Sequence, residues 1–158
     1  TTPAPEPQAE PPRAKTKAKA KTKAPPTARP APRPEPRAPK SPSTGKILAR
    51  ANALYQKDNL KGAVTEYKKV LAVDEWNDKA HIGLGTAYFD LEQNSLAIQH
   101  LKKAIKINPK NGQALVILGN VFQAMGDNGT AKKTYERYLK VDPNGKFAAD
   151  VKMILQAL

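Results

Sequence analysis

The sequence predicts an all-α solenoid preceded by a tail that cannot build a core, and three observations support this. Of the 15 prolines among 158 residues, 13 lie in residues 1–43. The same segment has no Val, Ile, Leu, Met, Phe, Tyr or Trp, so every large apolar residue lies after it. Those apolar residues recur with a period of 34, and within each period they follow helical spacing.

Residues 1–43 are predicted to be a disordered basic linker. They carry ten Lys and Arg residues against three Glu residues, a net charge of +7. Ordering the backbone costs about 1–2 kcal/mol per residue, and a segment without large apolar side chains has nothing to bury that would offset this cost. Frequent proline favours the extended polyproline II conformation, so we expect a stiff spacer.

One stretch of the tail is a candidate polyanion-binding site. Its lysines alternate with Ala and Thr, at Lys15, Lys17, Lys19, Lys21 and Lys23. This stretch resembles the Lys/Ala-rich tails of nucleoid-binding and linker-histone-like proteins. Such lysines neutralise phosphates, which gives weak, salt-sensitive binding to nucleic acid without sequence preference. The alternative is a solvated linker whose charges repel one another.

The folded part is predicted to contain three repeats, at 44–77, 78–111 and 112–145. Positions 34 residues apart hold similar residues: Ala63, Ala97 and Ala131; Tyr67, Leu101 and Tyr135; Leu71, Ile105 and Leu139. Within a repeat the apolar and small positions step by three and four, so each repeat is two amphipathic helices. Pro109 and Pro143 end the second helix of their repeats, because proline cannot continue a helix.

The last segment, 146–158, is predicted to be a helix that caps the stack. Its apolar residues share one helical face: Phe147, Val151, Ile154, Leu155 and Leu158. Stacked repeats expose a hydrophobic face at each end, and a helix with a polar outer surface covers it.

The residues at the repeated positions resemble those of the tetratricopeptide repeat, a helix-turn-helix unit of 34 residues. The middle repeat carries most of the signature: His81-x-x-Leu84-Gly85-x-x-Tyr88, then Ala97, Leu101, Ala104 and Pro109. The third repeat departs at Tyr138, where a small residue is usual, and the first has Glu75 in place of proline. The resemblance implies a right-handed superhelix whose concave groove binds a peptide or a partner protein.

The first helix of each repeat carries a second stripe, well away from the face that packs into the solenoid. By the resemblance, this stripe lines the concave groove. The candidate groove residues are Leu48, Asn52, Tyr55, Lys79, Ile82, Thr86, Phe89, Val116, Asn120 and Gln123. A merely solvated groove should be polar throughout, whereas this one mixes apolar side chains with amides, which suits a bound peptide. The alternative for any one of these residues is packing against the second helix of the preceding repeat.

The best-known groove chemistry of this family is the carboxylate clamp, which grips the carboxy-terminus of heat-shock chaperones. Carried over by position, the sequence keeps only Asn52 of that clamp. Leu48, Gly83, Gln113 and Ile117 stand where the family has lysine, asparagine, lysine and arginine. Binding of a chaperone tail through this clamp is therefore not expected.

The composition excludes several other classes. The absence of cysteine rules out a disulfide scaffold, a thiol nucleophile and cysteine-ligated metal sites. His81 and His100 have no matched catalytic partner in the sequence, and no phosphate-binding glycine loop is present. No apolar run reaches the length of a membrane span, and no signal-peptide pattern occurs. We expect no enzymatic activity, cofactor or metal, and a monomer in the cytoplasm.

The sequence thus predicts a non-catalytic scaffold or adaptor that binds a peptide or partner protein in its groove and is tethered by a flexible basic tail. Two alternatives remain open. In one, the tail binds nucleic acid or another polyanion and the repeats recruit partners. In the other, the chain is the C-terminal arm of a larger signalling enzyme, such as a bacterial protein kinase, since it begins with Thr1 rather than Met.

Overall fold

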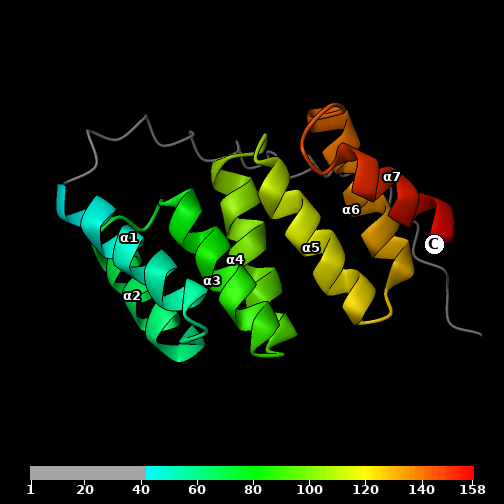
Figure 1. Cartoon of the computed structure of the whole chain (residues 1–158). Coiled ribbons are helices and arrows are strands. Elements are labelled where there is room, and N and C mark those ends of the chain that lie inside the picture. The colour runs from blue at the N-terminus through cyan, green and yellow to red at the C-terminus, as the bar shows by residue number, and fades with distance from the viewer. Residues whose placement is uncertain (1–41) are drawn as a thin grey trace, which may run out of the picture. The chain divides into compact units, whose positions relative to one another are not determined.

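The fold is a row of stacked helices, shown in Figure 1 as a computed structural model. The structure describes residues 42–158, and within this range it contains seven helices and no strand. The helices are α1 (Pro42–Gln56), α2 (Leu60–Val73), α3 (Asp78–Asp90), α4 (Asn94–Ile107), α5 (Gly112–Ala124), α6 (Asn128–Val141) and α7 (Ala148–Ala157). The predicted all-α solenoid is confirmed.

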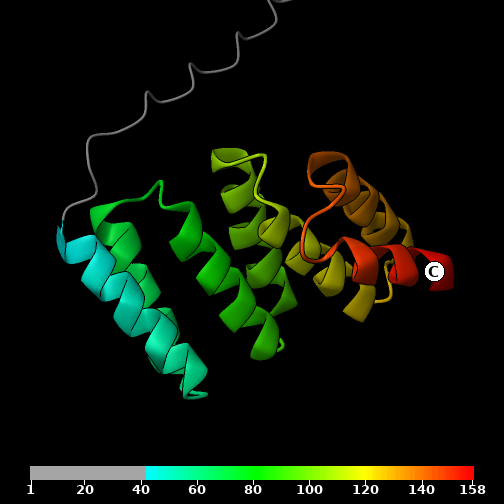
Figure 2. The ribbon, with the colours of Figure 1, turned by 45° about the horizontal axis from the view of Figure 1, so that its top comes forward.

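Neighbouring helices form three hairpins that stack on one another. The helix α1 packs on α2, α3 on α4, and α5 on α6, while α2 contacts α3 and α4 contacts α5. Figures 1 and 2 show this succession from the cyan α1 to the red α7, which rests on α6. The tail lysines Lys15 to Lys23 lie outside the described residues.

The helix starts and turns repeat with the same period as the core residues. The side chains of Asn77 and Asn111 accept hydrogen bonds from the backbone N–H of the third residue beyond, at 3.0 and 3.2 Å, and so cap α3 and α5. The turn inside each repeat contains one residue with positive φ: Asp58, Glu92 and Gly126. The repeat in the sequence is therefore also a repeat of local backbone geometry.

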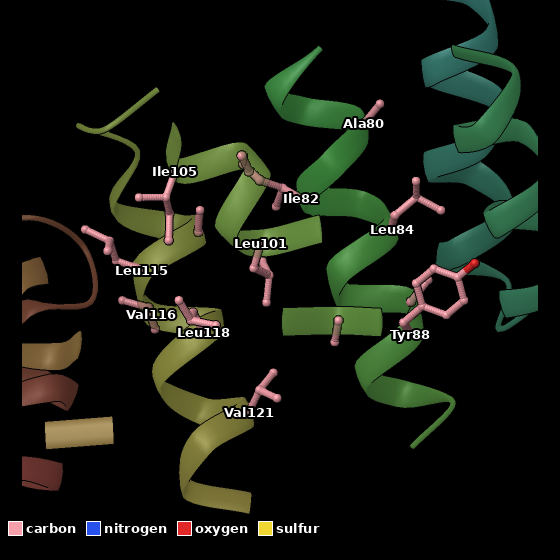
Figure 3. Packing of buried hydrophobic residues seen from close by; sticks show 14 of the residues in the cluster. Ala80, Ile82, Leu84, Tyr88, Leu101, Ile105, Leu115, Val116, Leu118 and Val121 are labelled. Carbon is pink, nitrogen blue, oxygen red and sulfur yellow. The ribbon is translucent and has the colours of Figure 1, made fainter. Parts of the chain in front are cut away.

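Small residues allow the two helices of a repeat to approach closely. A Cβ atom on Gly85 would lie 2.5 Å from Cγ of Leu101, and one on Gly119 would lie 2.7 Å from Cδ1 of Tyr135. Both partner side chains are fully buried. Figure 3 shows Leu101 among the side chains that fill the space between α3, α4 and α5.

No helix among the described residues is long and apolar enough to cross a membrane.

Candidate binding surface

The predicted groove stripe lies on the first helix of each repeat, and the structure brings these helices together. The central helix α3 contacts both α1 and α5, so the three form a continuous row. We call this row the groove face. Residues from all three predicted repeats are thus available to one ligand.

Two of the predicted groove residues are buried within the chain itself. Ile82 is 6% exposed and Val116 is 8% exposed, and both belong to the hydrophobic core. Figure 3 shows Ile82 pointing from α3 toward α4 and α5, while Leu84 and Tyr88 point to the other side. Both side chains therefore offer little surface to a ligand, because helices of this chain already cover them.

The remaining members of the stripe are accessible. Asn52, Lys79 and Gln123 are exposed, and the half-buried members are Leu48, Tyr55, Thr86, Phe89 and Asn120. The groove face is therefore less apolar than the sequence predicts.

The two asparagines of the groove face are held by tyrosines from the second helix of their repeats. The hydroxyl of Tyr67 donates to Oδ1 of Asn52 at 2.6 Å, and that of Tyr135 lies 2.7 Å from Oδ1 of Asn120. The Tyr135 hydroxyl also lies 2.9 Å from Oε1 of Gln123 and, with one proton, donates to one of these oxygens at a time. Burial raises the pKa of both tyrosines, so they remain proton donors at neutral pH.

Sequence analysis did not find these tyrosine–asparagine pairs, although a signal was present. Each asparagine precedes its tyrosine by 15 residues, in the first and third repeats alike. In the middle repeat Thr86 stands at the asparagine position, and its hydroxyl donates to the backbone oxygen of Ile82 at 2.9 Å. The groove face therefore presents oriented amides near its two ends and a hydroxyl that is bonded within α3 in its middle.

A further link joins α1 to α3 across the groove face. The hydroxyl of Tyr55 donates to a carboxylate oxygen of Asp90. Burial and, after it, the bond to Asp90 raise the pKa of Tyr55 to about 12. The polar end of Tyr55 is therefore engaged within the chain, and mainly its ring is left for a partner.

The residue that breaks the carboxylate clamp has a structural role of its own. A Cβ atom on Gly83 would overlap the ring of Tyr67, lying 2.7 Å from its Cε2 atom. Tyr67 is 3% exposed and held through its hydroxyl, so the ring has no room to move. The asparagine that the clamp requires at this position would not fit.

The histidines, which sequence analysis treated as isolated, form a pair between α3 and α4. Their Nδ1 atoms lie 3.0 Å apart, and Nε2 of His81 lies 3.2 Å from the backbone oxygen of Glu75. Because a carbonyl oxygen only accepts, His81 carries its proton on Nε2, and its bare Nδ1 accepts from Nδ1–H of His100. This chain of hydrogen bonds connects α4 through α3 to the loop before it.

Acidification should destabilise the fold through this pair. Burial lowers the pKa of His81, and burial together with His81 and Lys103 lowers that of His100 to about 4. The unfolded chain therefore binds protons first, and stability falls as the pH drops below about 6.5, until the folded-state pKa is reached. Allowing for the partial exposure of His100, we expect a loss of about 1 kcal/mol between pH 6.5 and 5.

Urea denaturation followed by circular dichroism at a series of pH values measures this loss. The variant His100→Gln should flatten the dependence between pH 6.5 and 5, whatever its stability at pH 7. An unchanged slope in the variant would show that other groups cause the dependence.

Residues that could hold a metal ion are not brought together. Among residues 42–158 no group of three or more His, Asp and Glu side chains has the geometry of a metal site. The histidine pair therefore serves packing in the described fold.

Family models match most of the helical part of the chain. The model described as TPR repeat matches residues 51–91 and 85–126, and the model described as tetratricopeptide repeat matches residues 112–144. A comparison with curated protein sequences found no match.

Solved structures with the same fold include domains that bind peptides. The first TPR domain of Spaghetti (RPAP3), bound to the HSP90 peptide SRMEEVD, is 25% identical with a TM-score of 0.66, over 72% of this chain and 91% of that one. The Sgt2 TPR domain from Aspergillus fumigatus is 25% identical with a TM-score of 0.68, over 76% and 82%.

A third structure resembles this chain in fold alone. The TPR2B domain of yeast Sti1, in a complex with pHsp70, is 17% identical with a TM-score of 0.69, over 72% of this chain and 93% of that one. Together, the helix hairpins, the period of 34 residues and the two family models show that the chain belongs to the tetratricopeptide repeat family.

Proposed function

We propose that the chain is a non-catalytic interaction module that binds an extended peptide segment of a partner protein along the groove face. The observation that carries this proposal is the pair of anchored amides, Asn52 and Asn120. The tyrosine hydroxyls bond the amide oxygens, so the amide N–H groups are free to bind peptide carbonyl oxygens.

Apolar contacts between the amides supplement this binding. The half-buried rings of Tyr55 and Phe89 pack against the core with part of their surface left open, and Leu48 does so on α1. An aromatic side chain of this kind contributes most to binding when it lies near the centre of an interface. Phe89, on the central helix α3, is the best-placed anchor for the partner.

The partner is not a chaperone tail held by the carboxylate clamp. The related RPAP3 domain binds an HSP90 peptide, and this relative supports peptide binding as the function of the groove face. The clamp residues themselves are absent here, and Gly83 cannot be replaced by the asparagine of the clamp while Tyr67 is present. The module therefore recognises a segment by its backbone and apolar side chains.

Other parts of the proposal rest on the sequence alone. The module is a cytoplasmic monomer, residues 1–43 tether it, and Lys15 to Lys23 add a weak, salt-dependent contact to a nucleic acid or acidic surface. The repeat boundaries 44–77, 78–111 and 112–145 with the cap 146–158 belong to the same proposal.

Removing the free amide donors should weaken binding while the fold stays intact. The variants Asn52→Asp and Asn120→Asp keep a side-chain oxygen for the tyrosine hydroxyl and lose only the N–H donors. Each should weaken the binding of a peptide selected on the full chain by about 1–3 kcal/mol, or roughly 5- to 150-fold in Kd. Phe89→Ala should weaken it by a similar amount.

The matched control is Gln113→Glu, which adds the same negative charge on the first helix of the third repeat without removing an anchored amide. Ile82→Asp is not a test of binding, because it would bury an unpaired charge and unfold the solenoid. Calorimetric titration measures the affinities, and thermal melting verifies the fold. Unchanged affinities in all three folded variants would rule out the groove face as the site.

A further inference from the structure

A cavity of about 330 Å³ opens beside the histidine pair. Its apolar walls come from Leu71 on α2, Trp76 in the loop before α3, and Ile107 at the end of α4. None of its lining residues belongs to the groove stripe. The volume is at the lower end of the range for ligand pockets, and it suits one side chain of a partner.

The open side of the cavity is basic. Lys103 and Lys106 of α4 line it, and both are exposed. Within residues 42–158 neither lysine takes part in an ion pair. The carboxylate of Glu75, which also lines the cavity, accepts a hydrogen bond from the indole N–H of Trp76 at 2.8 Å. The two lysine charges are therefore available to an anionic ligand.

The floor of the cavity contributes no charge at neutral pH. His81 and His100 line it, and burial holds the pKa of both below the ordinary value of histidine. The ring of His100 stacks on Tyr88, with centroids 5.6 Å apart, so the pair forms a flat, neutral surface. Flat neutral surfaces of this kind favour stacking with an aromatic ring.

We propose that this cavity is a second binding site, which takes one aromatic side chain of an acidic peptide segment. The ring enters between Trp76 and the histidine pair, and flanking carboxylates meet Lys103 and Lys106. This site lies apart from the groove face and does not depend on it. A partner that occupied both would gain affinity through two linked contacts.

The charge and composition of the chain argue against its own tail as the occupant. Residues 1–43 have a net charge of +7 and contain no aromatic residue. A second copy of the chain, with a net charge of +13, would be repelled as well. The complementary partner is therefore another protein with acidic residues around an aromatic one.

The single tryptophan of the chain makes the cavity directly observable. Trp76 is the only source of an indole N–H signal and the dominant source of fluorescence. The probe is a blocked peptide, acetyl-Glu-Glu-Phe-Glu-Glu-amide, titrated into the full chain. We expect a saturable shift of the Trp76 indole signal by nuclear magnetic resonance, and a much weaker response to the same peptide with Gln for Glu or with Ala for Phe.

Charge variants test whether the cavity lysines are responsible. The double variant Lys103→Gln, Lys106→Gln should weaken the binding of the probe by about five- to tenfold. The matched control Lys132→Gln, Lys133→Gln removes the same charge from exposed positions on α6 and should change the affinity by less than about twofold. Phe89→Ala, on the groove face, should leave it unchanged.

Three results would overturn the proposal. The first is the absence of a saturable Trp76 shift at millimolar peptide. The second is an equal response to the peptide without Phe. The third is an equal loss from the two lysine pairs, which would show diffuse attraction to the basic second helices rather than a site.

Discussion

Replacing Tyr138 by alanine should destabilise the chain by about 3–5 kcal/mol and release α7 from the solenoid. The Tyr138 side chain is 1% exposed and is among the largest fully buried groups in the described residues. Its ring meets that of Phe147 edge-on at 6.2 Å, and its hydroxyl accepts a hydrogen bond from the backbone N–H of Phe147 at 3.2 Å. The substitution therefore leaves a cavity and removes the anchor of the helix that follows.

Two measurements separate these effects. Urea denaturation gives the loss of stability, and hydrogen exchange of the α7 amides shows whether the cap opens on its own. Tyr138→Phe is the control, because it keeps the ring and removes only the hydroxyl, and should cost about 1 kcal/mol. If alanine left the exchange of α7 as slow as in the parent chain, Tyr138 would not be what holds the cap.

The structure explains why this tyrosine is tolerated where the family usually has a small residue. A Cβ atom on Gly112 would lie 2.7 Å from Cε2 of Tyr138, and one on Gly145 would lie 2.6 Å from its hydroxyl oxygen. The bulk of the side chain is thus accommodated by two glycines, one at the start of α5 and one in the turn before α7. A departure in the sequence at one position is compensated at two others.

The sequence predicts the helices well because their determinants are local. Spacing of three and four, proline after the second helices and a period of 34 all lie within a few turns of the residues that they position. The two family-wide glycines, Gly85 and Gly119, follow from the same pattern. Each of these features needs only one repeat and its nearest neighbour to be understood.

The surface of the groove face was harder to predict because it depends on longer-range packing. A helix in the first position of a repeat contacts its own partner and two neighbours, so a second apolar stripe can face either the solvent or another helix. Ile82 and Val116 lie on the covered part of α3 and α5, whereas Phe89 remains partly accessible. Periodicity alone cannot separate these cases.

The histidine pair escaped prediction for a related reason. His81 and His100 lie on different helices, 19 residues apart, and neither belongs to a motif. Their contact follows from the crossing of α3 and α4, which sets the distance between the side chains. Pairs such as Tyr67 and Asn52 were more accessible, because the same spacing occurs again in the third repeat.

Placing a side chain at Gly83 should have the second large effect on stability. The variant Gly83→Val should destabilise the chain by about 3 kcal/mol, since its Cβ atom would overlap the buried ring of Tyr67. The same substitution at Gly45 in α1, where a Cβ atom would have no neighbour within 4 Å, should change stability by less than about 0.5 kcal/mol. Urea denaturation of both variants makes the comparison.

A double variant tests whether the cause is the contact with Tyr67. Tyr67→Ala alone should be destabilising because it empties a buried site and leaves the amide oxygen of Asn52 without its donor. In the Gly83→Val background the same change should cost less, since valine occupies part of the space that the ring leaves. Additive losses would contradict the overlap, because two residues that compete for one volume must show a favourable coupling energy when both are changed.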